Sequence, residues 1–167
     1  MNPLWNYLWP MLMMGLVVGG VTGTIAFRRE AKRIVIALSA GLLVSLGLAA
    51  AWHGPLGASD RFSAHVERTA RTALDYYEMP KIEAHLHRSP VTRRLVLSGP
   101  ADDFQTSELA RLLSQLPGVS RAQWSEAPAG RPLILEGAAA AILGFLVGSL
   151  LAYLFELRRR YNAQWNW

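Results

Sequence analysis

Few residues in this chain have the types and spacing that chemistry requires, and the first group is Glu83, His85 and His87. Residues two apart in a strand point to the same face, so these three side chains would share one face. A metal site needs three or four ligands that converge on one point. Because the intervening positions are apolar, the pattern is also typical of a strand with one solvated face. We favour the solvated face over a metal site.

A second candidate group consists of the adjacent carboxylates Asp102 and Asp103. They precede a helical pattern, where a carboxylate caps the helix and suits its dipole, and Gln105 completes a capping-box spacing. The chain has no cysteine and no G-x-S-x-G, Walker or H-E-x-x-H motif. We therefore expect no enzyme activity, no catalytic residue, no cofactor, no metal and no small-molecule substrate.

These groups lie in residues 53–131, whose pattern predicts a small folded domain. Ser59 or Asp60 can cap a first helix that stops before Pro80, and a second helix follows Asp102. Alternating residues predict strands near 82–86, 94–99 and 119–125, which gives the order α-β-β-α-β. The expected buried faces are, in the first helix, Phe62, Val66, Ala70, Ala73 and Tyr77, and in the second, Leu109, Leu112, Leu113 and Leu116.

Part of this domain resembles the BON domain of bacterial envelope proteins. The resemblance covers about residues 62–124 and rests on Leu-Ser-Gly at 97–99, a helix, and Pro-Gly-Val at 117–119. It implies a non-catalytic module that attaches to lipid or protein. Ala122 and Trp124 replace the aliphatic and Asn positions common in the last strand of that family, so no binding residue is carried over.

Three long apolar stretches flank the domain, at residues 4–27, 34–52 and 132–157. Each is close to the roughly 20 residues that cross a bilayer as a helix. We expect a membrane α-helical protein with three transmembrane helices and a small α+β extramembrane domain. The expected segments are a first helix (1–27), a cytoplasmic loop (28–33), a second helix (34–52), a periplasmic domain (53–131), a third helix (132–157) and a cytoplasmic aromatic tail (158–167).

The charge pattern predicts how the chain sits in the membrane. Four of the six residues at 28–33 are basic, and Arg158–Arg160 follow the third stretch. Three spans place both clusters on one side, and basic residues mark the cytoplasmic side. We therefore expect a multi-pass protein of the bacterial inner membrane, with its N-terminus and central domain in the periplasm and its C-terminus in the cytoplasm.

Each apolar stretch carries small residues four positions apart, which lets another helix approach closely. Packing within the monomer and packing on a partner protein are both open, and we expect the third stretch to contribute most to a partner interface. The C-terminal aromatics fit either a helix end in the headgroup layer or a docking peptide. The candidate interface residues are Gly15, Gly19, Gly23, Gly41, Ser45, Ala140, Gly144, Gly148, Ala152, Tyr161, Trp165 and Trp167.

These features favour a non-catalytic accessory or scaffolding subunit of a multi-subunit inner-membrane complex, respiratory or photosynthetic. Its expected partners are other integral membrane subunits and membrane lipids, and nucleic acid is not expected, because the surplus of basic residues lies beside the membrane. The alternative is a stand-alone envelope protein whose BON-like domain binds lipid or other envelope material. A transporter or membrane enzyme is disfavoured, because no ionisable residue lies at mid-depth of the three stretches.

Overall fold

The computed structural model describes residues 2–28, 31–124 and 130–164. The chain divides into two compact units. One unit contains Met1–Tyr7 and Gly57–Leu135, and the other contains Leu8–Leu56 and Glu136–Trp167. The first of these, which we call the extramembrane unit, therefore includes the first residues of the chain and extends four residues past the predicted C-terminal boundary at residue 131.

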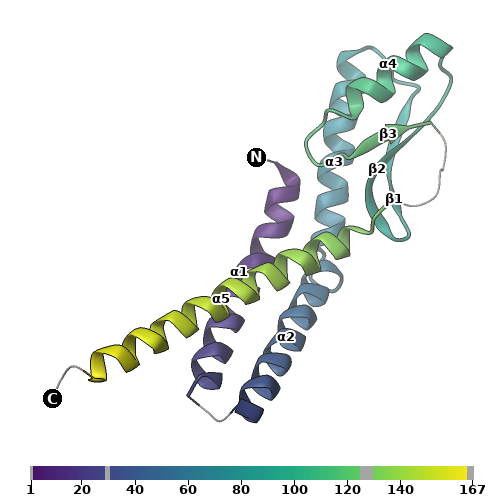
Figure 1. Ribbon diagram of the computed structural model, residues 1–167. Helices are drawn as coiled ribbons and strands as arrows, with labels where there is room; N and C mark the ends of the chain where they lie inside the picture. Colours follow the sequence, from purple (N-terminus) through teal and green to yellow (C-terminus); the bar gives the residue numbers. More distant parts are fainter. Residues whose placement is uncertain (1, 29–30, 125–129, 165–167) are drawn as a thin grey trace. The chain divides into compact units, whose positions relative to one another are not determined.

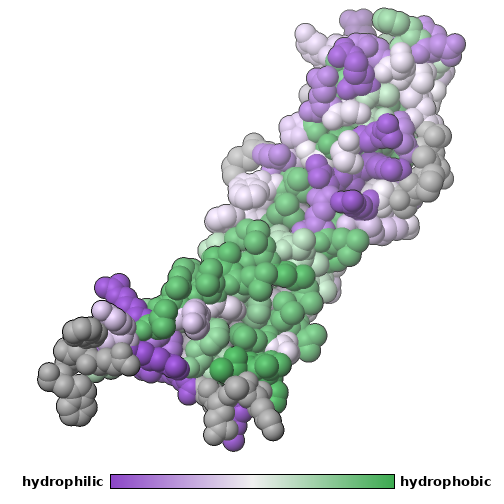
Figure 2. All heavy atoms as spheres, viewed as in Figure 1, coloured by the Kyte–Doolittle hydropathy of each residue, from purple (hydrophilic) through white to green (hydrophobic). Residues whose placement is uncertain are grey.

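The second unit is built from three long helices, α1 (Pro3–Ala26), α2 (Ala31–His53) and α5 (Leu133–Gln164). Among the described residues, these three helices are long and apolar enough to cross a membrane. Exposed apolar side chains on them include Val17, Leu43 and Leu146. Figure 2 shows a largely hydrophobic surface over this part of the molecule. The prediction of a multi-pass membrane protein is confirmed at this level.

The elements of the domain follow one another as predicted. They are α3 (Ala58–Tyr76), β1 (Glu83–Arg88), β2 (Val91–Ser98), α4 (Asp103–Leu113) and β3 (Arg121–Gln123), shown in Figure 1. The sheet order is β1-β2-β3, with β1 and β2 antiparallel and β2 and β3 parallel. Ser89 and Pro90 form the turn of the hairpin, joined by a cis peptide bond.

One face of the sheet forms the core of the domain. Leu86 pairs with Leu95, and Leu95 pairs with Ala122, so the three apolar side chains line up across the strands. All are buried, together with Leu74 of α3 and Leu113 of α4. Burial of large aliphatic side chains stabilises the domain by about 1.5–3 kcal/mol each.

Helix α3 also covers the outer edge of β1. The Glu67 carboxylate accepts a hydrogen bond from the Leu86 backbone N–H at 3.0 Å and pairs with Arg88 at 2.8 Å. Unpaired backbone groups on an edge strand invite pairing with another chain. The side chain of Glu67 satisfies one of them within the domain.

The helix starts and ends differ from some expectations. Helix α4 has the predicted capping box, because Asp102 Oδ1 accepts from Gln105 N at 2.7 Å and Gln105 Oε1 accepts from Asp102 N at 3.2 Å. Neither Ser59 nor Asp60 caps α3, because the helix begins two to three residues earlier than predicted, after Gly57, whose φ of 68° suits glycine.

Two further helix boundaries differ from those that the sequence predicts. Helix α5 continues through Arg158–Arg160 to Gln164, so the described part of the expected tail is helical. Helix α2 begins at Ala31, which shortens the expected loop at residues 28–33.

The first turns of α1 belong to the extramembrane unit. The Tyr7 ring lies 6.0 Å from that of Phe62 on α3, and both side chains are buried. A Cβ at Gly118 would lie 3.0 Å from Pro3 Cγ, so these backbones approach closely. The extramembrane unit therefore contains residues outside the predicted range 53–131, because Met1–Tyr7 and the fully buried Leu133 belong to it.

Candidate functional site

The small residues of α1 and α5 face each other inside the helical unit. A methyl group at Gly15 would overlap the carbonyl oxygen of Ala141, and one at Gly19 would overlap that of Phe145. The hydroxyl of Ser149 donates to the Gly19 carbonyl at 3.3 Å. Without a hydrophobic drive between helices in lipid, such close packing and interhelical hydrogen bonds supply the association.

The glycines of α5 likewise lie against the backbone of α1. A methyl group at Gly144 would overlap the carbonyl oxygen of Leu12, and one at Gly148 would overlap that of Leu16. Helix α1 of the same chain therefore occupies the groove of α5. Packing within the chain is one of the two arrangements that the sequence leaves open, and the glycines of this groove are in backbone contact with α1.

Most of the remaining small residues among the candidate interface residues also lie in contacts between helices of this chain. A Cβ at Gly23 would lie 2.8 Å from that of Ala152, and one at Gly41 would lie 2.7 Å from Thr22, which brings α2 against α1. Ser45 is fully buried, and its hydroxyl donates to the Gly41 carbonyl. Ala140 is only half-buried.

Ala141, rather than Ala140, lies on the inner face of α5. At 100° per residue, Ala140 falls at the margin of the buried arc that runs through Gly144, Gly148 and Ala152. A spacing of four residues advances the face by about 40° per step, so a strict four-residue series drifts off a straight interface.

The aromatic tail is described only in part. Tyr161 lies on the last turns of α5 and is 61% exposed. Trp165 and Trp167 lie outside the described residues.

An ion-pair cluster that the sequence interpretation did not identify lies at one end of the helical unit. Glu156 is 6% exposed and contacts three arginines, Arg28, Arg159 and Arg160. The signal in the sequence was the Glu-Leu-Arg-Arg-Arg segment at 156–160, which places basic residues three and four positions after a carboxylate on one helix face.

Glu83, His85 and His87 all lie on β1, whose pairing register shifts between Leu86 and Arg88. His85 Nε2 lies 3.3 Å from Glu83 Oε2, and His87 Nδ1 lies 3.1 Å from the Pro90 carbonyl oxygen. Within residues 2–28, 31–124 and 130–164, no three metal-ligating side chains come together. Glu83 and His85 are exposed, whereas His87 is half-buried.

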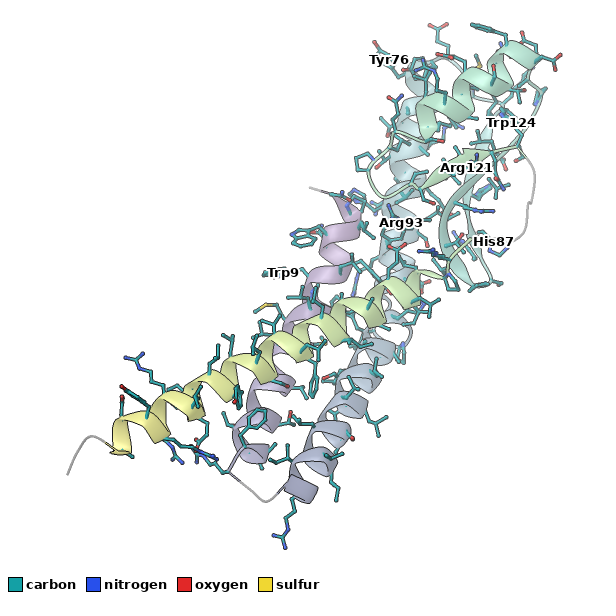
Figure 3. The ribbon with its side chains drawn as sticks, viewed as in Figure 1. Trp9, Tyr76, His87, Arg93, Arg121 and Trp124 are labelled. Atoms are coloured by element: carbon teal, nitrogen blue, oxygen red, sulfur yellow. The ribbon has the colours of Figure 1, made fainter. Side chains whose placement is uncertain are left out.

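The second group that the sequence interpretation missed is an exposed pair of tyrosines at the end of α3. Tyr76 is 82% exposed and projects from the domain (Figure 3), and its ring meets that of Tyr77 edge-on at 5.4 Å. We call these two residues and Leu116 the tyrosine surface. They border an open depression of about 610 Å³ that is also lined by His65, Arg68, Thr69, Thr72 and Ala73.

The expected place of Tyr77 in the core is therefore wrong. Tyr77 is the residue that follows the last turn of α3, and Leu74 is the last residue of that helix to reach the core. The helical spacing alone would place Tyr77 on the buried face, but the helix ends before it.

Beside the tyrosine surface, Glu108 and Arg111 of α4 form an ion pair. A hydrogen bond from Arg111 lowers the pKa of Glu108, and the same hydrogen bond raises the pKa of Arg111. Both groups are at the surface. The ion pair stabilises α4 at pH values above the unfolded-state pKa of Glu108. This stabilisation is lost as the pH falls through the lowered pKa that Glu108 has in the folded state.

Comparison of the chain with protein families, curated proteins and solved structures gave no match.

Proposed function

We propose that this chain is a non-catalytic accessory subunit of a multi-subunit complex in the bacterial inner membrane, respiratory or photosynthetic. The three helices serve as an internally packed anchor. The periplasmic domain presents the tyrosine surface to a membrane-protein partner.

The observation that carries the proposal is the exposure of Tyr76 and Tyr77 in a domain whose other tyrosine, Tyr7, is buried. Tyrosine is enriched at the centres of protein interfaces, because its rigid ring contributes contact area at a low cost in entropy. The depression beside the two rings offers space for a side chain of the partner. Its threonine, histidine and arginine side chains supply the polar rim that interfaces have.

The arrangement of the spans supports the orientation in this proposal. Met1–Tyr7 and Gly57–Leu135 share one compact unit, which agrees with an N-terminus on the same side as the domain. The basic residues at 28–33 and Arg158–Arg160 then belong on the opposite side, which is the cytoplasm by the charge rule.

Photo-crosslinking in native membranes tests the proposal. A benzophenone amino acid at Tyr76 should give one major adduct with an integral membrane protein that also co-purifies in mild detergent. The matched control is Phe104, a second exposed aromatic residue of the domain, which is 75% exposed. A chain that purifies alone, with no Tyr76 adduct, would overturn the accessory-subunit proposal.

The second candidate is a stand-alone envelope protein whose domain binds lipid or other envelope material. It is favoured by the α-β-β-α-β order, which the structure has and which the BON-like sequence features imply. Crosslinks from Tyr76 to lipid, and binding of the lone protein to liposomes through its domain, would support it over the first.

A further inference from the structure

The cluster around Glu156 joins the ends of two membrane helices. Arg159 Nη2 lies 2.8 Å from Glu156 Oε1, Arg160 Nε lies 3.4 Å from the same oxygen, and Arg28 Nε lies 3.7 Å from Oε2. Arg160 also donates from Nη2 to the Phe27 carbonyl at 2.7 Å, which ties α5 to the end of α1. We call Arg28, Arg159 and Arg160, with Glu156, the arginine collar.

The collar carries more positive charge than its carboxylate can neutralise. Three guanidinium groups surround one carboxylate, so the four side chains have a net charge of about +2. The Glu156 side chain is 8% exposed, whereas those of Arg159, Arg28 and Arg160 are 54%, 55% and 64% exposed. The carboxylate is thus enclosed, and the guanidinium groups remain open to an external anion.

The collar is also pre-organised. Each guanidinium has five N–H donors, and the contacts to Glu156 and Phe27 use only some of them. The hydrogen bonds of Arg159 and Arg160 hold these two side chains in place, which reduces the entropy lost when an anion binds. Planar guanidinium groups bind phosphate through two parallel hydrogen bonds.

The position of the collar indicates the source of the anion. It lies where the apolar part of α5 ends at Leu157 and where α1 ends at Ala26. The end of an apolar span lies at the headgroup layer of a bilayer, and basic pockets between transmembrane helices bind the headgroups of anionic lipids. We propose that the arginine collar is a binding site for the phosphate of an anionic phospholipid.

The test uses the full-length protein in nanodiscs. Phosphatidylcholine discs receive increasing fractions of phosphatidylglycerol, and native mass spectrometry counts the anionic lipids that stay bound. Arg159→Gln should weaken retention about tenfold, because it removes a charge-assisted contact. The matched control is Arg33→Gln, which removes the same charge from an exposed position near the start of α2.

Equal losses of bound anionic lipid for Arg159→Gln and Arg33→Gln would show that the basic surface attracts anionic lipids in general. That result would overturn the proposal of a binding site at the arginine collar. If Arg159→Gln does not fold in phosphatidylcholine discs, Arg28→Gln replaces it, because Arg28 makes the longest ion pair of the collar. Inorganic phosphate is added at millimolar concentration to separate the two sources of phosphate. Displacement of the bound lipid by phosphate alone would show a soluble-phosphate site and overturn the lipid assignment.

Discussion

At the scale of single residues, the glycines of α1 and α5 are not equivalent. Gly144 and Gly148 lie against the backbone of α1, whereas no described atom lies within 4 Å of a methyl group placed at Gly20. The glycines with four-residue spacing on α1, namely Gly15, Gly19 and Gly23, lie close to α5, whereas Gly20 is outside that series and a side chain there would point away from other helices.

Gly144→Ala should destabilise the helical unit by about 1–3 kcal/mol, because the added methyl group must push α1 away from α5. Gly20→Ala is the control and should be neutral or slightly stabilising, because alanine favours the helix and meets no neighbour. Thermal unfolding of the full chain in detergent measures both. Equal unfolding temperatures for the two variants would contradict the α1–α5 contact.

At the scale of elements, α4 is held at its start by local hydrogen bonds and at its centre by the core. The capping box of Asp102 and Gln105 satisfies backbone groups that the helix leaves unpaired. Leu109 and Leu113 then anchor one face of this short helix, while Leu112 and Leu116 are only half-buried. We therefore expect the capping box to contribute to the stability of α4, because few side chains of this helix are buried.

Asp102→Ala should cost about 1 kcal/mol of local stability, because the backbone N–H of Gln105 loses its acceptor. Hydrogen–deuterium exchange of the α4 amides should then become faster. Asp103→Ala, which removes a carboxylate from the same turn without removing the capping bond, should change exchange less. A larger effect at Asp103 would show that charge, and not the cap, stabilises the start of α4.

At the scale of the whole molecule, the start of the chain and residues 57–135 form one compact unit. Tyr7 of α1 packs on Phe62 of α3, so the beginning of the chain contributes to the core of the extramembrane unit. Residues 53–131 alone would expose Phe62 and lack Leu133. A fragment with those limits should be less stable than the same segment in the full chain.

Tyr7→Ala should destabilise the extramembrane unit by about 3 kcal/mol, because it leaves a cavity beside Phe62. The expected result is faster hydrogen–deuterium exchange in α3 of the full-length protein. Trp5→Ala is the control on the same helix, since Trp5 is 54% exposed. Unchanged exchange in the Tyr7 variant would show that α3 is stable without α1.

The membrane topology can be tested in the same full-length chain, which has no cysteine. Ser89→Cys, in the exposed turn of the β1–β2 hairpin, should react with an impermeant thiol reagent in intact spheroplasts. Asn162→Cys, exposed near the end of α5, should react only after lysis. Labelling in the opposite pattern would invert the orientation.

The sequence alone determined the three membrane helices, the α-β-β-α-β order and the α4 cap. These features depend on composition, periodicity and neighbours a few positions away. The exposure of Glu83 and His85 on β1 followed from strand alternation for the same reason.

Tertiary structure decided which surfaces face each other. Only three-dimensional contact shows that the α5 groove holds α1, that Tyr7 enters the extramembrane core and that Tyr77 lies outside it. Arg28 and Glu156 are likewise far apart in the sequence and meet only in the fold. Periodicity identifies which face of a helix packs against another element. Which element packs there depends on the tertiary fold of the chain.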